Sequence, residues 1–378
     1  MKILKYCFAT LMLTLGIVSL SSCGKESLGE SIFNTTEEVL DPNSATYKFD
    51  KWLKENYLDV YNLQFLYKMA DISTNMNYNL VPATYDNAVD LAVLCKYLWF
   101  DAYEAVTGDQ LPEDPAFFLK SYGPRIILLV GSPAYNPSSG TMILGLAEGG
   151  VKISLFRVNS MRISDFNQMN EYYFKTMHHE FTHILHQTKT YPSEFNYISV
   201  GHYDSSNWQD RNEGQCASLG FVSTYASSEF REDFAETVAN YIVKTDAQWN
   251  RILELASRGW ASDVSDDVTA DFYCYYYYPN NDPEQDLVYV NESDVNIVDG
   301  EKYYKRETDD QGNRIKVYDV EDTDGIDGKE AILQKVEIAR TWLKDSWNLD
   351  LDALREEVQT RQANYDITEL RKQVENIE

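Results

Sequence analysis

The chain has 378 residues, of which 60 are acidic and 33 basic, so its formal net charge at pH 7 is −27. This balance argues against nucleic-acid binding, because neutralising phosphates requires clustered Lys and Arg. The negative charge suits a domain whose copies repel one another and which is tethered at a distance from a membrane. The chain is long enough to form a large hydrophobic core.

The start of the chain resembles a bacterial export signal. Two lysines precede an apolar run, residues 8–20, which is too short for a comfortable membrane span. The run ends in the sequence LSSC, which resembles a lipobox, in which the Cys becomes the lipidated first residue of the mature chain. We therefore expect a lipoprotein signal peptide over 1–22, lipidation at Cys23 and a polar tether over 23–45. An ordinary secretory signal with an incidental Cys is the alternative.

Apolar and aromatic residues at helical spacing follow the tether. They predict helices over Tyr47–Tyr61 and Asp86–Val106, and a short one over Pro115–Lys120. We interpret this part as core rather than as a ligand site, because large apolar side chains at this spacing usually pack. After the expected lipidation site, three widely spaced cysteines follow, which predict no disulfide framework and no cysteine zinc site. A single Cys216–Cys274 disulfide is an alternative that the sequence does not decide.

The spacing of the apolar residues then changes from helical to extended. Short apolar runs predict strands at Arg125–Gly131, Met142–Leu146 and Val151–Val158. Two adjacent glycines before Val151 suit the turn of a hairpin. We expect a small mixed sheet directly before the next helix, with Val151–Val158 near an edge that can pair with an extended peptide.

A histidine-rich helix follows the last predicted strand. Residues 175–187 read KTMHHEFTHILHQ and contain His179-Glu180-Phe181-Thr182-His183, a match to H-E-x-x-H. On a helix, residues i and i+4 share one face, so both imidazoles can bind one Zn²⁺ at about 2.0–2.1 Å. Glu180 would then lie beside the open position, placed to take a proton from water. All five histidines fall between His178 and His202, whereas histidines that only pack would be scattered.

Two histidines do not complete such a site, because zinc hydrolases keep three protein ligands. His186 lies on the same helix, but the helix axis holds it too far from a metal between the other two imidazoles. The metzincin pattern also fails, since His186 stands where Gly belongs and Lys189 where the third His belongs. His202 is a further candidate for the third ligand, although nothing around it marks a ligand motif.

A second predicted helix, within residues 223–239, offers carboxylates for the third position. Ser228 is a possible cap of this helix. Its expected packed side is formed by Phe230, Phe234, Val238 and Tyr241. Glu232 and Glu236 are four residues apart, so the first can bind zinc while the second hydrogen-bonds a ligating imidazole. Glu229 with Asp233 has the same spacing, and a solvated acidic face also fits the pattern.

Several motifs resemble those of a known family. HEFTH followed by EDFAE is similar to the gluzincin pattern, particularly its lethal-factor-like branch, in which a Tyr lies seven residues before the ligating Glu, as Tyr225 does before Glu232. GLAEGGVKISL, HHEFTHILHQ, GFVSTYASS and EDFAETVA together resemble the zinc-binding metallopeptidase lipoproteins of Bacteroidetes. The similarity covers most of 47–260 and 330–365.

The resemblance implies an α+β, zincin-like metallopeptidase that is mostly helical, with a small mixed sheet ahead of the active-site helix. It implies zinc as cofactor, with His179, His183 and Glu232 as ligands, Glu180 as general base and Tyr225 as a transition-state donor. The implied function is hydrolysis of peptide or protein substrates by an outer-membrane lipoprotein, exposed on the cell surface. A surface binding lipoprotein that captures protein or glycan through an inactive or structural zinc site is the alternative.

The remaining part of the chain is acidic, with 20 Asp or Glu against 6 Lys or Arg in residues 263–330. Alternating residues predict a β-hairpin over Glu301–Val320. The run of four tyrosines, Tyr275–Tyr278, is interpreted as a packed strand, with a binding surface as the alternative. The segment Asp322–Gly328 does not fit the EF-hand template, so we expect a solvated loop. Glu330–Trp347 and Asp350–Asn364 are predicted helices whose Trp and Leu residues pack on the catalytic lobe.

These expectations divide the mature chain into the tether and one zincin-like domain. The predicted domain spans 46–378, with an N-lobe over 46–200 and a C-lobe over 201–378. The C-lobe carries an acidic β-hairpin insertion over about 265–325.

Overall fold

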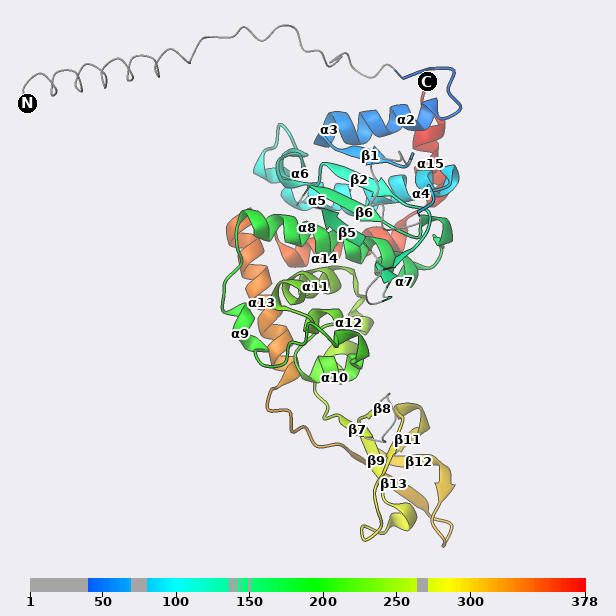
Figure 1. Ribbon diagram of the computed structural model, residues 1–378, viewed down its shortest axis with the longest axis vertical. Coiled ribbons are helices and arrows are strands. Elements are labelled where there is room, and N and C mark those ends of the chain that lie inside the picture. The colour runs from blue at the N-terminus through cyan, green and yellow to red at the C-terminus, as the bar shows by residue number, and fades with distance from the viewer. Residues whose placement is uncertain are drawn as a thin grey trace, which may run out of the picture. The chain divides into compact units, whose positions relative to one another are not determined.

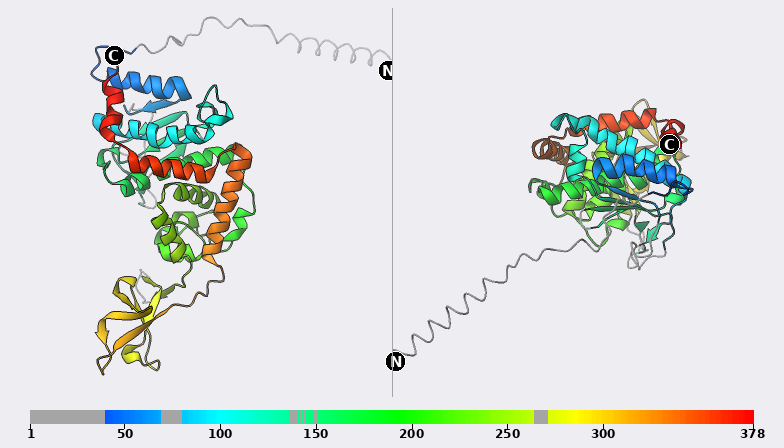
Figure 2. Two further views of the ribbon diagram at one scale, coloured as in Figure 1. Left: turned by 180° about the vertical axis from the view of Figure 1, so that it is seen from behind. Right: turned by 90° about the horizontal axis from the view of Figure 1, so that it is seen from above.

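The computed structural model describes residues 40–68, 80–135, 140, 142–143, 145–148, 151–263 and 271–378 (Figures 1 and 2). The chain divides into two units, Met1–Tyr47 and Lys48–Glu378. Of the first unit only residues 40–47 are described, as turns in which the N–H groups of Ser44 and Tyr47 donate to Asp41 and Ser44. The predicted signal peptide, Cys23 and the tether up to residue 39 lie outside the described residues.

The predicted N-terminal helices are confirmed. The first run consists of α2 (Tyr47–Leu53), the π-helical turn η1 (Lys54–Leu58) and α3 (Asp59–Tyr61). The second consists of α4 (Tyr85–Cys95), the π-helical turn η2 (Lys96–Phe100) and α5 (Asp101–Thr107), and the third is α6 (Phe117–Tyr122). Their large aromatic side chains are buried in the main core, as the helical spacing predicted.

A four-stranded mixed sheet lies beside these helices in the order β1-β2-β6-β5 (Figure 1). Its strands are β1 (Gln64–Leu66), β2 (Ile126–Leu129), β6 (Lys152–Leu155) and β5 (Gly145–Glu148). The pairs β1–β2 and β2–β6 are parallel, whereas β5 and β6 are antiparallel. Ile127, Leu129, Ile153 and Leu155 are fully buried, which explains why these runs are apolar.

We expected Val151–Val158 near an edge of the sheet, and β6 lies directly beside β5, the last strand of the sheet. The predicted strand Met142–Leu146 was wrong, because it is divided. β4 (Met142–Ile143) pairs with β3 (Ala134–Tyr135), and β5 begins separately at Gly145. The two glycines of the predicted turn lie outside the described residues.

The histidine-rich segment forms the long helix α8 (Lys175–Thr188), which continues α7 (Phe166–Met169) through the π-helical turn η5 (Asn170–Phe174). Its apolar face, with Met177, Phe181 and Leu185, is buried in the main core. The opposite face packs against α11 (Phe230–Val243), and Figure 1 shows the two helices side by side.

The remaining helices are α9 (Phe195–Ile198), α10 (Glu213–Ser218), α12 (Asp246–Leu255), α13 (Gly328–Trp347), α14 (Leu351–Asn364) and α15 (Ile367–Glu375). Of these, α9, α13 and α14 pack against α11, α10 and α12 pack against each other and against α13, and α15 packs against α4. The prediction for α13 and α14 is confirmed, because their Trp and Leu residues join the main core. In the part of the chain that the structure describes, no helix is both long and apolar enough to cross a membrane.

A separate five-stranded antiparallel sheet lies between α12 and α13 in sequence, in the order β10-β9-β13-β12-β11. Its strands are β9 (Tyr275–Tyr277), β10 (Val288–Val290), β11 (Val295–Val298), β12 (Glu301–Thr308) and β13 (Arg314–Asp319), and β7 (Ala261–Asp263) pairs with β8 (Asp271–Tyr273). The predicted hairpin is confirmed as β12–β13. Tyr275 and Tyr277 are buried against Ile315 and Val317, so the tyrosine run is a packed strand.

The three described cysteines, Cys95, Cys216 and Cys274, are free and buried, so the bridge that the sequence left open is not formed. Residues 322–327 form an irregular loop that carries exposed acidic residues, as expected, and Gly328 begins α13.

Candidate metal centre

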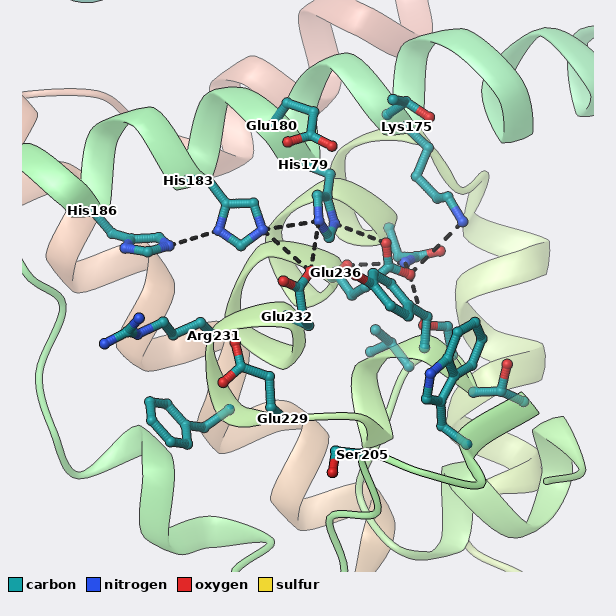
Figure 3. A pocket seen from close by; sticks show the side chains of 18 of the residues that line it. Lys175, His179, Glu180, His183, His186, Ser205, Glu229, Arg231, Glu232 and Glu236 are labelled. Atoms are coloured by element: carbon teal, nitrogen blue, oxygen red, sulfur yellow. Dashed lines mark hydrogen bonds and ion pairs between the residues drawn. The ribbon is translucent and has the colours of Figure 1, made fainter. Parts of the chain in front are cut away.

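Three donor atoms converge where α8 packs on α11 (Figure 3). The Nε2 atoms of His179 and His183 lie 3.0 Å apart, and Oε2 of Glu232 lies 3.0 Å from the first and 3.2 Å from the second. Donors bound tetrahedrally at about 2.0–2.1 Å are separated by roughly 3.3 Å. The three atoms therefore already have nearly the spacing that one zinc ion requires. Among the described residues, no other group of His, Cys, Asp or Glu has this arrangement.

The electrostatics of this cluster favour a bound cation. Burial disfavours a charged ring, yet hydrogen bonds to Glu232 and Glu236 raise the pKa of His179 to about 10. Burial likewise opposes the charge of Glu232, but hydrogen bonds to His179 and His183 hold the pKa of that carboxyl well below its usual range. The carboxylates thus stabilise positive charge on the imidazoles, and they would stabilise a bound divalent ion in the same way.

A buried carboxylate fixes the first imidazole from behind. Oε1 of Glu236 lies 2.9 Å from Nδ1 of His179, opposite the nitrogen that faces the cluster. Oε2 of Glu236 accepts from Ser223 Oγ at 2.6 Å and from Asn240 Nδ2 at 3.1 Å, and Lys175 Nζ lies 3.7 Å away. The structure therefore places Glu236 where the sequence expected a support for a ligating imidazole. The contributions of Ser223, Asn240 and Lys175 have no motif and were missed.

The second imidazole has a different support. Nδ1 of His183 lies 2.8 Å from Nε2 of His186, one turn further along α8. Burial, together with the neighbouring His183 and Arg231, lowers the pKa of His186 to about 4, so this ring is neutral at pH 7. The sequence argued against His186 as a zinc ligand and indicated no other role for it. Its i,i+3 spacing from His183 was the available signal.

Glu229 and Asp233, the alternative carboxylate pair on α11, lie outside the donor group. Glu229 is the N-cap residue of α11 and lines the same cavity, but it does not belong to the donor group. Burial and the nearby Glu232 raise its pKa. Ser228, the cap that the sequence suggested, is not the N-cap. Phe230 was also misassigned, because it is 37% exposed and lines the cavity instead of packing.

Asp233, the partner of Glu229 in the alternative spacing, forms a fully buried ion pair. Its Oδ2 lies 2.6 Å from Nζ of Lys335 on α13, and both side chains are 0% exposed. Nζ of Lys335 also donates to Ser199 Oγ at 2.8 Å and to the carbonyl of Gly220 at 2.7 Å. The hydroxyl of Tyr203 donates to Asp233 at 2.8 Å. Burial raises the pKa of Asp233 and lowers that of Lys335, while their mutual attraction opposes both shifts.

The remaining histidines lie outside the donor group. His178 is fully buried, with Nδ1 3.1 Å from the hydroxyl of Tyr103, and burial lowers its pKa to about 3. The carbonyl of His202 accepts from Arg211. His202 is not among the residues that line the cavity around the donor group.

The donor group opens onto a cavity of about 1450 Å³. Glu180 lines it from α8, directly after His179, and Figure 3 shows it beside the imidazoles. Tyr225 lies across the donor group, with its ring centroid 5.9 Å from that of His179 and 4.8 Å from that of Trp208. Burial and the charge of Glu232, to which it is hydrogen-bonded, raise the pKa of Tyr225, so the phenol stays a donor. Trp208 was not predicted, because no motif marks it.

This arrangement can hold a metal ion with one face open to the cavity, a carboxylate beside that face and a phenol across from it. Such a set can activate water and stabilise a developing oxyanion. A helix that carries two imidazoles and a neighbouring helix that carries the third ligand fix the three donors without any loop.

Comparisons with known proteins relate the chain to a zinc-binding family. Residues 42–352 match the model of a family described as "Putative zinc-binding metallo-peptidase". A crystal structure described as a "putative zinc-binding metallo-peptidase" from Bacteroides caccae is 32% identical to this chain. The match covers 90% of this chain and 97% of the Bacteroides caccae chain, with a TM-score of 0.58. No curated protein matches the chain.

Proposed function

The chain belongs to the family of zinc-binding metallopeptidases matched above, and on this basis we propose that it is a zinc-dependent endopeptidase. The observation that carries the proposal is the convergence of three donor atoms, 3.0–3.2 Å apart, at the wall of an open cavity. His179, His183 and Glu232 would hold the ion. Three protein ligands and one open position are typical of catalytic zinc, whereas structural sites are closed by four.

A zinc ion at these donors would polarise the scissile carbonyl and lower the pKa of the attacking water. The protein supplies the proton transfers. Glu180 accepts the proton of the water as it attacks the carbonyl carbon, and then delivers that proton to the leaving amine. Its position on α8, one residue after His179, holds the carboxylate beside the reacting atoms.

Tyr225 supports the same step from the other side of the cavity. Its hydroxyl donates to the carbonyl oxygen as negative charge develops there. Because burial and Glu232 keep its pKa raised, the phenol does not ionise at neutral pH. The end strand β5, which packs near α8, can add an extended substrate chain to the sheet by backbone hydrogen bonds.

The proposal includes the location of the enzyme. Lipidation at Cys23 would anchor the domain to the outer membrane through the tether, on the cell surface. The net charge of −27 supports a body that stands away from an anionic membrane.

The experiment compares wild type with Glu180→Gln, which keeps the shape of the side chain and removes the base. We expect Glu180→Gln to bind zinc as wild type does and to hydrolyse peptides about 10²–10⁴-fold more slowly. Full turnover by this variant would refute the mechanism. If wild type itself binds zinc in a closed site and hydrolyses no peptide, the chain is a binding lipoprotein with structural zinc.

A further inference from the structure

A histidine, not a carboxylate, supports the second imidazole of the donor group. Nδ1 of His183 and Nε2 of His186 are 2.8 Å apart, and His186 is only 8% exposed. His183 presents its Nε2 to the donor group, where it lies 3.2 Å from Glu232. With a metal ion bound at this Nε2, the proton of His183 would be on Nδ1, placed to donate to Nε2 of His186. Figure 3 shows the two rings in line with the donor group.

The ring of His186 is held by aromatic neighbours. It meets Tyr191 edge-on, with centroids 5.6 Å apart at 87°, and Phe234 at 6.4 Å and 89°. Tyr191 is itself stacked on Phe234 at 4.0 Å and 6°. Because the ring cannot turn freely among these neighbours, its Nε2 lone pair is fixed toward His183.

The charges of the site explain why a neutral acceptor suits this position. Glu232 and Glu236 already place two carboxylates at the donor group, and the only described ammonium near Glu236 is Lys175, at 3.7 Å. A third carboxylate at position 186 would add a buried negative charge without a buried cation. A neutral imidazole orients His183 without that charge.

We propose that His186 is a positioning residue that holds His183 with its Nε2 lone pair directed at the zinc ion. It acts only through His183 and does not touch the substrate. Outer partners of metal-bound histidines fix the tautomer and the ring orientation, and their loss typically weakens metal binding by about 10–100-fold. The role rests on the zinc site of the proposed function but does not require that the protein be a peptidase.

The chain offers a matched control on the same helix. His178 is also buried, and its Nδ1 is also hydrogen-bonded, to the hydroxyl of Tyr103, but its ring lies against Trp99 and Tyr103 and not against the imidazoles of the donor group. His178→Phe and His186→Phe each remove a buried, hydrogen-bonded imidazole from α8. Only the second removes the acceptor of His183, so the comparison separates positioning of a ligand from general loss of packing.

The test measures zinc affinity by chelator competition, and the visible d–d absorption of the Co²⁺-substituted protein, for wild type and three variants. We expect His186→Phe to weaken zinc binding about 10–100-fold and to change the Co²⁺ spectrum. His186→Gln, whose Oε1 can replace the lost acceptor, should restore most of the affinity and the spectrum. His178→Phe should leave both unchanged, whatever it does to the unfolding temperature of the apoprotein.

Zinc affinity and a Co²⁺ spectrum equal to wild type in His186→Phe would overturn the proposal. It would also be overturned if His186→Gln failed to restore binding while folding as wild type does. The readouts use the metal ion alone, so they separate this proposal from the peptidase function. A wild type that binds zinc but cleaves nothing would end the peptidase proposal and leave the role of His186 testable.

Discussion

The buried ion pair between Asp233 and Lys335 gives the sharpest stability prediction. Lys335→Met keeps the length of the side chain but removes the ammonium, which lies 2.6 Å from Asp233 and 2.7 Å from the carbonyl of Gly220. Both members of the pair are 0% exposed, so water cannot replace the lost partner. The carboxylate still accepts from the hydroxyls of Tyr203 and Thr237, at 2.8 and 3.4 Å.

Removing one partner of a buried pair costs about 3–5 kcal/mol, and a buried carbonyl left unpaired adds about 1–3 kcal/mol. Because Met fills the space of the Lys stem, the cavity contribution is small. We therefore expect Lys335→Met to lower the free energy of unfolding by roughly 4–8 kcal/mol, a large part of the usual 5–15 kcal/mol. Urea unfolding followed by tryptophan fluorescence measures this change.

Two controls test the reasoning. Asp233→Asn in the Lys335→Met background removes the unpaired charge while its amide can still accept from Tyr203, so the double variant should be more stable than Lys335→Met alone. Arg251→Met breaks the exposed pair with Glu292 and should change stability by less than about 1 kcal/mol. A loss below about 1 kcal/mol in Lys335→Met, or a double variant no more stable than the single one, would refute the argument.

Three further predictions concern the metal site and the anchor. Glu232→Ala should lower the zinc content of the purified protein far more than Glu229→Ala, as measured by elemental analysis, and the reverse order would move the third ligand to Glu229. In the apoprotein, the raised pKa of His179, about 10 against about 6.5 unfolded, adds stability that is complete below pH 6.5 and is lost as the pH rises toward 10. The unfolding temperature of the apoprotein should therefore fall between these pH values, and His179→Gln should lack that part of the slope. Cys23→Ala should move the protein from the membrane fraction to the soluble fraction on cell fractionation, whereas an unchanged distribution would exclude lipidation as the anchor.

The local parts of the site were readable from the sequence. The i,i+4 spacing of His179 and His183 depends only on helix geometry, so the structure needed no distant contact to bring them together. The helix was equally secure, because no Pro or Gly interrupts it and its apolar positions repeat at helical spacing. The expected hairpin β12–β13 and the C-terminal helices were local in the same sense.

The choice between Glu232 and Glu229 as the third zinc ligand could not be made from local sequence. Glu232 with Glu236 and Glu229 with Asp233 have the same spacing, and spacing alone leaves both open. What separates them is the contact of Asp233 with Lys335 on α13, which comes from a distant part of the chain. Which strand ends the sheet was not local either, since it depends on the order in which all four strands pair. Phe230 has the right periodicity for packing, but the first turn of α11 faces the cavity.

The residues that hydrogen-bond the proposed zinc ligands were the hardest to predict from the sequence. Glu236 could be proposed from its spacing, whereas Ser223, Asn240 and Lys175 converge on it from three separate positions without any pattern. His186 was visible in the sequence, yet its role depends on the direction of the His183 ring.

The central claim is that one zinc ion is held by two imidazoles and one carboxylate with a position left open. Anomalous diffraction from crystals of the purified protein, collected above and below the zinc absorption edge, tests it directly. We expect one zinc peak, about 2.0–2.2 Å from Nε2 of His179, Nε2 of His183 and a carboxylate oxygen of Glu232, with its remaining face toward the cavity. A peak bound by Glu229, a fourth protein ligand that closes the site, or no zinc at these residues would contradict it.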